Sequence, residues 1–369
     1  MGISTEYEES LLTFGVYYLS VALFIIIGSI SFGRTEESFN ILMWTILAML
    51  SSMILLLFGV SAIEAKVFYM LLAGASVGIG IPSCLACFAD NTSAENRGHT
   101  GAIAFFFTSL TFVPLAIIVG ILKAQDFALL SFFWALLSLI LVVVFRVKKK
   151  ATEEGKVSLR SVIRNKQFLL YFVPWVMFCF IDAFEAPILQ QYVIENFGNN
   201  FMNSILLMET IVTAFAILAA GFLVDYYGRR RILLGGFIIL GIAHAIVGIA
   251  SWSTFSWYLY ALIDGLALGI FIVTFVFTVW GDLSSGGTRK KYYAVGSLPF
   301  FVIVYVQKIV APYILGIDIS AVFSFASFFL FLAVWPLFNA PETLPEKKMK
   351  ERELKKYIEK AKKIKEKYD

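Results

Sequence analysis

Long runs of apolar residues, separated by short polar segments, make up most of this chain. Each run has about 20 residues or more, which is enough for one helix to cross a hydrocarbon layer of ~30 Å. The pattern therefore predicts an all-α membrane protein with eleven spans. We expect these spans at 11–33, 40–60, 66–90, 100–122, 127–147, 168–193, 203–224, 231–251, 255–280, 291–316 and 319–339.

The composition agrees with this pattern and excludes several classes of protein. The chain has 369 residues, is 59% hydrophobic and has a mean hydropathy of +0.82. A soluble domain of this size could not bury so much apolar surface. No nucleotide-binding glycine loop is present, so we expect neither an enzyme nor a nucleotide-driven pump, and no cofactor or nucleic-acid partner. Cys84 and Cys87 have metal-site spacing, but they lie inside an apolar run, which favours a packing role.

The basic residues predict the orientation in the membrane. Nearly all of the 30 Lys and Arg residues fall in alternate loops and in the C-terminal tail. The exceptions are Lys66, Lys123 and Lys308. Because basic loops remain in the cytoplasm, we expect a multi-pass plasma-membrane protein with a cytoplasmic C-terminus and an external N-terminus. The expected organisation is an N-terminal bundle (1–147), a cytoplasmic linker (148–166), a C-terminal bundle (167–340) and a charged tail (341–369). The tail is either an amphipathic helix on the inner membrane surface or a solvated segment.

One polar turn between two apolar runs carries an unusual pattern. Gly221 is followed by Asp225, Gly228, Arg229 and Arg230 in the spacing Gly-x-x-x-Asp-x-x-Gly-Arg-Arg. Gly228 permits a sharp turn, and Asp225 can accept hydrogen bonds from helix N-terminal N–H groups. The pattern resembles the cytoplasmic loop signature of the major facilitator superfamily. The alternative interpretation is an ordinary basic loop.

An internal repeat supports this resemblance. When the first five expected spans are shifted by 192 residues, they coincide with the last five. The same shift moves the position of Asp90 onto that of Asp282, and the position of Arg97 onto that of Arg289. The loop Ser93–Gly98 and the ending Ala340–Thr343 are similar to the Arg-Gly loop and the Pro-Glu-Thr ending of sugar-porter-like members of the superfamily.

The resemblance implies two six-helix repeats, with the partner of span 168–193 missing from the chain. The chain would then hold spans two to twelve of the family fold. This absence has three explanations, which are a start assigned too late, a fold with eleven spans, and a partner that fills the gap. We favour the late start. The resemblance also implies a cytoplasmic gate that opens and closes as the bundles rock. Its residues would be Gly221, Asp225, Gly228, Arg229, Arg230, Asp90, Arg97, Asp282 and Arg289.

Ionisable residues occur inside the last six spans but not inside the first five. Such residues are functional candidates because charge is costly in a bilayer. They are Asp182, Glu185, Glu209, His244, Asp264 and Lys308. All of these except His244 are predicted to bind the substrate or a proton.

Asp182 and Glu185 are three positions apart, so they share a helix face. Two close carboxylates in an apolar medium resist joint ionisation, so one of them can carry a coupling proton. Lys308 could neutralise an acid when the site is empty, and Asp264 could face the same space. Structural ion pairs are the alternative. We expect Glu209 to be interfacial and His244 to be a packed, neutral side chain on a peripheral span.

These features predict a secondary active transporter that moves a small polar organic solute, such as a sugar or organic metabolite, by alternating access. The expected partners are the solute itself, a proton as co-substrate, and the lipid bilayer that surrounds the helices. Export of a cationic or amphipathic compound is an alternative, supported by the excess of acids. A non-transporting sensor or subunit that uses the same fold is a third.

Overall fold

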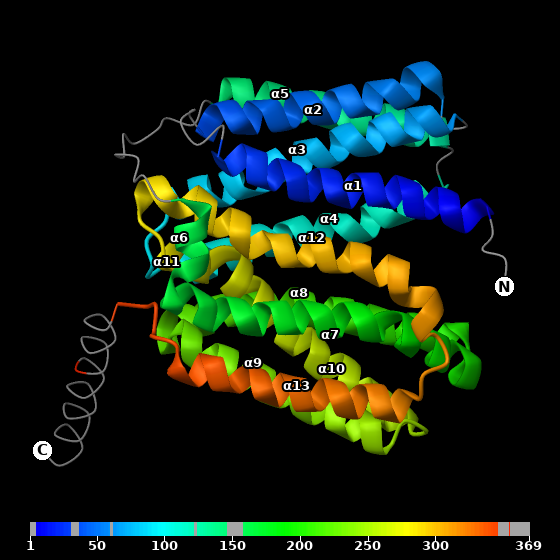
Figure 1. The fold of residues 1–369 in the computed structure, drawn as a ribbon, viewed down its shortest axis with the longest axis vertical. Coiled ribbons are helices and arrows are strands. Elements are labelled where there is room, and N and C mark those ends of the chain that lie inside the picture. Colours follow the sequence, from blue (N-terminus) through cyan, green and yellow to red (C-terminus); the bar gives the residue numbers. More distant parts are fainter. Residues whose placement is uncertain are drawn as a thin grey trace, which may run out of the picture.

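The computed structural model describes residues 5–30, 37–59, 62–121, 124–145, 158–345 and 354, and these residues are almost entirely helical (Figure 1). The first half contains five long helices. They are α1 (Thr5–Ile30), α2 (Glu37–Phe58), α3 (Ile63–Asp90), α4 (Arg97–Ile121) and α5 (Ala124–Val144).

The second half begins with a short helix and continues through six long helical segments. These elements are α6 (Leu159–Arg164), α7 (Lys166–Phe197), α8 (Asn199–Tyr227), α9 (Arg229–Ile249), α10 (Thr254–Phe271), α12 (Arg289–Ile314) and α13 (Ile319–Asn339). Two short elements follow α10 without a break, the π-helix η2 (Ile272–Thr278) and the helical turn α11 (Val279–Asp282), and the 3-10 helix η3 (Gly286–Thr288) precedes α12.

Each expected span coincides with one long helical segment, so the prediction of an all-helical membrane protein is confirmed. Among the described residues, ten segments are long and apolar enough to cross a membrane. The remaining expected span, 100–122, falls on α4, which is not one of those ten. Residues 146–157 of the linker region and almost all of the tail lie outside the described residues, so the amphipathic helix expected there is not addressed.

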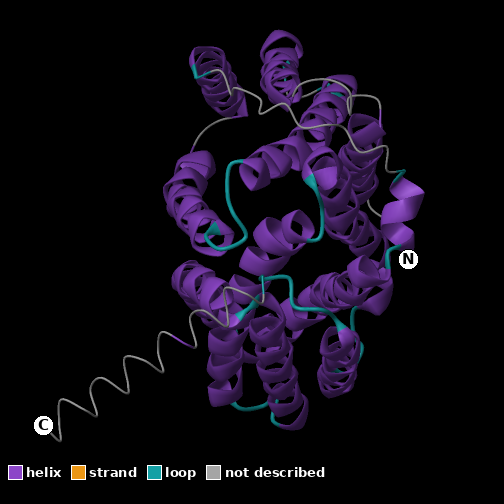
Figure 2. Ribbon diagram, turned by 90° about the vertical axis from the view of Figure 1, so that its left-hand side faces the viewer, coloured by secondary structure: helices purple, strands orange, loops and turns teal. Residues whose placement is uncertain are grey.

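The helices form two packed groups that meet along two seams (Figures 1 and 2). In one group α1 and α2 both pack on α3. In the other α8 packs on α10, and α13 packs on α9 and α7. The groups meet where α1 packs on α12 and where α4 packs on α8.

Glycines at equivalent places in the repeat allow close helix approach within each group. A Cβ atom at Gly74 of α3 would lie 2.5 Å from the carbonyl oxygen of Tyr17 on α1. A Cβ atom at Gly265 of α10 would lie 2.9 Å from the carbonyl oxygen of Glu209 on α8. Side chains at these positions would separate the paired helices.

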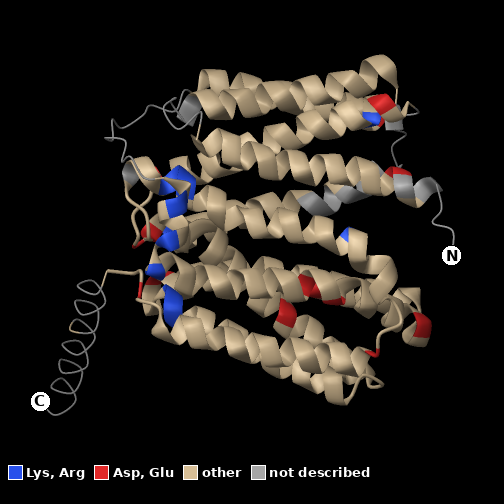
Figure 3. Cartoon of the chain, in the orientation of Figure 1, with Lys and Arg blue, Asp and Glu red and all other residues tan. Residues whose placement is uncertain are grey.

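Charged residues are divided between the two ends and the interior (Figure 3). Most Lys and Arg of the described part gather at the end of the bundle where α9 and α12 begin. Acidic residues also occur in the middle of the second helix group. The fold thus has a basic end and an acidic interior.

Candidate functional site

Glu185 on α7 is the centre of a buried polar cluster. The helix α7 runs without a break from Lys166 to Phe197, although Pro174 and Pro187 lie inside it. Only 5% of Glu185 is exposed. Its Oε1 atom accepts a hydrogen bond of 2.5 Å from the Tyr260 hydroxyl of α10. Its Oε2 atom lies 2.8 Å from Nε2 of His244 on α9.

The hydrogen bonds of His244 show that this cluster holds a proton. Its Nδ1 atom lies 2.9 Å from the backbone oxygen of Leu240, which can only accept, so Nδ1 carries hydrogen. The contact between Nε2 and Glu185 then requires one further proton. That proton resides either on the imidazole beside a carboxylate or on the carboxyl beside a neutral imidazole.

His244 corrects one of the expectations from sequence. It is buried and packs against the ring of Phe323, as expected of a packed side chain, but it also bonds to Glu185 and so belongs to the acid cluster. Tyr260 also belongs to the site, and it is absent from the residues predicted from the sequence. A signal was available, because Tyr260 and Asp264 are four positions apart on one helix and therefore share a face.

Three more carboxyl groups lie near this pair. Asp264 is buried in α10 and interacts electrostatically with Glu209, Asp182 and Glu185. Glu209 on α8 is half-buried and belongs to the same group, rather than standing apart at an interface. Asp182 lies on an exposed part of α7, within interaction distance of Glu185, Glu209 and His244. The structure thus brings together four of the five predicted binding residues.

Lys308 is the fifth predicted residue and does not join the acids. Its ammonium nitrogen lies 4.2 Å from the centre of the Phe14 ring on α1. Its backbone oxygen accepts a hydrogen bond of 2.7 Å from the Tyr7 hydroxyl. Among the described residues it forms no ion pair with an acid. The rotation of α12 directs this side chain to the seam with α1, so His244 takes the place expected for Lys308.

A second polar cluster lies at the basic end of the molecule and centres on Arg229. The side chain of Arg229 is fully buried. Its Nε atom lies 2.9 Å from Oδ2 of Asp282, and its Nη2 atom lies 3.1 Å from Oδ1 of Asp225. The same Nη2 atom donates to the backbone oxygen of Ala94, in the loop between α3 and α4. One arginine therefore links the two helix groups.

Asp225 caps the N-terminus of α4. Its carboxyl oxygens accept hydrogen bonds from the backbone N–H groups of Gly98, at 3.0 Å, and His99, at 2.8 Å. The His99 ring also lies within 2.9 Å of Asp225. A carboxylate is stabilised at a helix N-terminus by the unpaired N–H groups and the helix dipole. The capping expected of Asp225 is present, and the helix that it caps belongs to the other half of the chain.

Equivalent residues of the two repeats pair crosswise. Arg97, the first residue of α4, pairs with Asp282, the last residue of α11. Arg289, the first residue of α12, pairs with Asp90, the last residue of α3. The first pair is almost completely buried, whereas the side chains of the second are 20% and 24% exposed. Both pairs hold the two groups together at the basic end.

The segment after α13 completes this network and was not included among the site residues. The Glu342 carboxylate accepts hydrogen bonds from the backbone N–H groups of Arg229, at 2.9 Å, and Arg230, at 3.2 Å. The Thr343 hydroxyl donates to Oδ2 of Asp282 at 3.2 Å. The Pro-Glu-Thr resemblance was the signal that could have added Glu342 to the predicted site.

The remaining predicted gate residues have steric or local roles. Gly228 has a φ of +100°, and a side chain there would collide with Glu342. A Cβ atom at Gly221 would collide with Ala102 on α4. The guanidinium of Arg230 donates to the backbone oxygen of Ala340 at 3.0 Å. All nine predicted gate residues therefore gather at one end of the molecule.

No group of three or more His, Cys, Asp or Glu in the described part of the chain is placed to hold a metal ion. The acid cluster therefore gives no structural indication of a resident metal. What it can do chemically is bind and release protons or attract a cation.

Comparison with protein families gives one match. The model described as "Major Facilitator Superfamily" matches residues 176–366. The comparison with curated proteins gave no match.

Solved structures with the same fold include several transporters. A bacterial homologue of the iron transporter ferroportin, in an outward-facing state, has a TM-score of 0.74 at 14% identity and covers 90% of each chain. The proton:xylose symporter XylE has a TM-score of 0.71 at 13% identity, over 93% of this chain and 89% of the other. The human organic anion transporter MFSD10 has a TM-score of 0.69 at 13% identity, over 89% of this chain and 83% of the other.

Proposed function

Since the chain belongs to the major facilitator superfamily, we propose that it is a proton-coupled secondary active transporter of a small organic solute. The observation that carries this proposal is the 2.8 Å contact between the Glu185 carboxyl and Nε2 of His244, buried among the membrane-spanning helices. A buried acid–base pair of this kind is costly in a membrane unless it is used. The Tyr260 hydroxyl would hold the carboxylate in place as the proton leaves.

Asp182 gives the proton a route to the pair. This carboxyl lies on the exposed part of α7, one helical turn before the buried Glu185. Asp264 and Glu209 add two further carboxyl groups to the same cluster. We assign Asp182 to proton delivery and Glu185 to proton storage, while Asp264 and Glu209 tune the charge of the cluster. Lys308 has no part in this proposal.

Alternating access would use the ion pairs at the basic end as the gate. The bundles proposed at 1–147 and 167–340 would rock about the seams that α1 forms with α12 and α4 forms with α8. In the structure the crosswise pairs are formed, which would correspond to the closed position of this gate. The basic residues favour a cytoplasmic position for this end in the plasma membrane.

Sugars and organic metabolites are the first substrate class to test. The ending Ala340–Thr343 supports this class, and two structural relatives are described as proton symporters of xylose and fucose. A cationic solute is the second class, because the cluster consists of four acids and one histidine, while Lys308 lies elsewhere.

The test is solute-dependent proton movement in liposomes. Purified protein is reconstituted with a trapped pH-sensitive dye, and sugars, carboxylic acids, amino acids and amines are added in turn. At least one class should move protons in wild type and in Glu195→Gln, a matched control at the exposed end of α7. Solute uptake that is independent of the pH gradient would contradict proton coupling. No uptake of any class would favour a sensor or subunit instead.

A further inference from the structure

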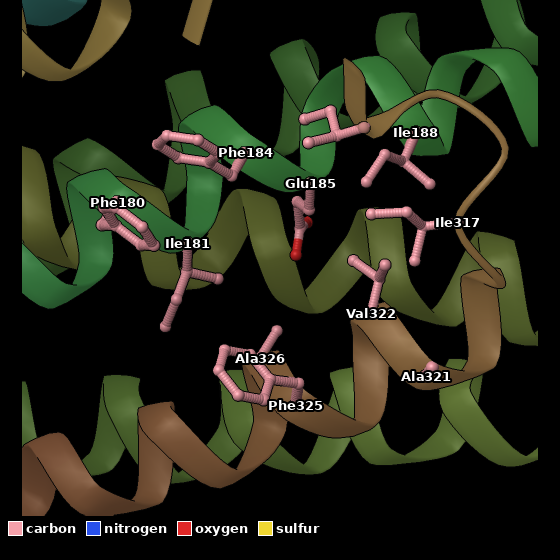
Figure 4. Close-up of a pocket in the computed structure, with 11 residues that line it drawn as sticks. Phe180, Ile181, Phe184, Glu185, Ile188, Ile317, Ala321, Val322, Phe325 and Ala326 are labelled. Carbon is pink, nitrogen blue, oxygen red and sulfur yellow. The ribbon is translucent and has the colours of Figure 1, made fainter. Parts of the chain in front are cut away.

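Lys308 on α12 is a basic residue inside a membrane-spanning helix, and proton coupling gives it no role. Among the described residues it forms no ion pair with an acid, whereas Lys66 on α3 lies 2.5 Å from Glu9. Charge inside a bilayer is costly unless it is paired or used. Glu185 does not provide the partner, because its carboxyl group points into the space between α7 and α13 (Figure 4). The positive charge of Lys308 is therefore left to be explained.

The ammonium group of Lys308 is held inside the bundle rather than at the membrane surface. Its nitrogen lies 4.2 Å from the centre of the Phe14 ring. Phe14 is nine residues after the start of α1 at Thr5, which corresponds to about 14 Å along the helix. A lysine that only avoided lipid would extend its stem to the head groups instead. The contact with Phe14 thus keeps the charge at depth, between the two helix groups.

Aromatic side chains line this seam and offer hydroxyl groups. The Phe14 ring stacks on that of Tyr18, one turn further along α1, with ring centres 6.5 Å apart. Tyr305, one turn before Lys308 on α12, packs so closely on α1 that a Cβ atom at Gly15 would lie 2.9 Å from its ring. Within the described part of the chain, the hydroxyls of Tyr18 and Tyr305 form no hydrogen bond. The seam therefore combines one ammonium group, two available hydroxyls and apolar ring faces.

Lys308 lies at the same depth in the bundle as the acid cluster. Lys308 and Glu185 are each 19 residues after the first residue of their helix, Arg289 and Lys166, and both helices begin at the basic end. This spacing corresponds to about 28 Å in each case. The helix α12 packs on both α7 and α1, but the four acids of the cluster lie on α7, α8 and α10. A solute between the helix groups would thus meet a positive charge on α12.

We propose that Lys308 binds a carboxylate group of the transported solute, with the apolar part of the solute against the rings of the seam. An ammonium group beside hydroxyl donors suits a carboxylate, because charge-assisted hydrogen bonds are shorter and stronger than neutral ones. The bound carboxylate would replace the Phe14 ring as the partner of the ammonium group. This inference rests on the proposed function and deepens it, since it names organic carboxylates as the substrate class.

The test compares carboxylates with their neutral amides. Benzoate, phenylacetate and hippurate are added to the purified protein, each beside the amide of the same acid as its matched control. At least one carboxylate should raise the unfolding temperature, since a ligand of the folded state stabilises it by mass action, and its amide should not. Failure of all three carboxylates, or equal stabilisation by acid and amide, would overturn the proposal.

Variants assign the carboxylate to Lys308. Lys308→Gln should weaken binding about 10- to 100-fold, as expected for the loss of a hydrogen bond from a charged group. Lys308→Arg keeps the charge and should retain most of the affinity. Lys66→Gln, which removes the lysine paired with Glu9, should bind as wild type does. Unchanged affinity in Lys308→Gln would overturn the proposal.

A labelling experiment tests Lys308 without a variant. Acetic anhydride acetylates lysine amines, and mass spectrometry reports Lys308 and Lys66 separately. The stabilising carboxylate should slow the acetylation of Lys308 but not that of Lys66, and equal acetylation of Lys308 with and without it would reject the site. Because these experiments need no pH gradient, carboxylate binding without proton movement rejects only proton coupling. Proton-coupled uptake of a neutral solute, without carboxylate binding, rejects only this inference.

Discussion

Nε2 of His244 lies 2.8 Å from Oε2 of Glu185, while the other ring nitrogen of His244 faces the carbonyl oxygen of Leu240. The histidine is thus fixed as a proton donor on one side, and a single proton is left to be shared on the other. Both residues are more than nine-tenths buried. An acid and a base held this way can change their joint charge by one without any change in the helix positions.

We expect Glu185→Gln to separate proton coupling from solute binding. The amide keeps the shape of the side chain but cannot carry the proton, so uphill uptake should fall about 100-fold or more, as expected when an essential proton-transfer group is lost. Exchange of solute across the membrane needs no net proton movement and should persist. Asp182→Asn should give the same result if it delivers the proton. The measurement is uphill uptake beside counterflow exchange in liposomes, and equal loss of both activities would argue for a structural role.

His244→Gln should destabilise the protein and flatten the pH dependence of transport. Removing the histidine leaves a buried carboxylate without its partner, which costs about 3–5 kcal/mol when the remaining charge stays unpaired. Adding Glu185→Gln should restore most of this loss, because the unpaired charge is then gone. Chemical denaturation of the single and double variants measures the effect. If the double variant is no more stable than His244→Gln, the proposed pairing is wrong.

The two crosswise ion pairs should differ in strength. Arg97 and Asp282 are nearly completely buried, whereas Arg289 and Asp90 are partly exposed. Water screens exposed pairs, so a double-mutant cycle on Arg289 and Asp90 should give about 0.2–1 kcal/mol. Breaking the Arg97 and Asp282 pair by removing one partner should cost about 3–5 kcal/mol. Similar coupling energies for both pairs would contradict this ranking.

Glu342→Gln should weaken the closed gate by about 0.5–2 kcal/mol, the usual range for the loss of a helix cap. The side chain caps the start of α9 through the N–H groups of Arg229 and Arg230, and the negative charge adds to these bonds. Spin labels at Ser93→Cys and Ser285→Cys, in a background without native cysteines, can report the separation of the helix groups at the basic end. The distances should shift towards longer values. Glu64→Gln, on the exposed first turn of α3, is the control.

The sequence was sufficient to locate the helices and both groups of charged residues. Spans are predictable because each is a continuous apolar run that must satisfy its own backbone in lipid. The repeat placed Asp90 with Asp282 and Arg97 with Arg289, but it could not show that the pairs form across the repeat. That outcome depends on which helix ends meet.

Side-chain contacts between helices were the part that the sequence could not supply. His244 was expected only to pack on a peripheral span and Lys308 to lie near the acids, whereas in the structure His244 joins the acids and Lys308 does not. Both errors concern the rotation of a helix about its own axis relative to its neighbours. Glu342 and Tyr260 were missed because their partners are more than 70 positions away in the chain, although each carried a local signal.

The crosswise pairing has an electrical consequence. Each half of the gate keeps one aspartate and one arginine when the pairs separate, Asp90 with Arg97 on one side and Asp282 with Arg289 on the other. Moving one elementary charge through 100 mV involves about 2.3 kcal/mol of work, but these neutral halves carry no net charge through the field. Separation of the crosswise pairs therefore moves no net charge through the field, and the membrane voltage does little work on this step.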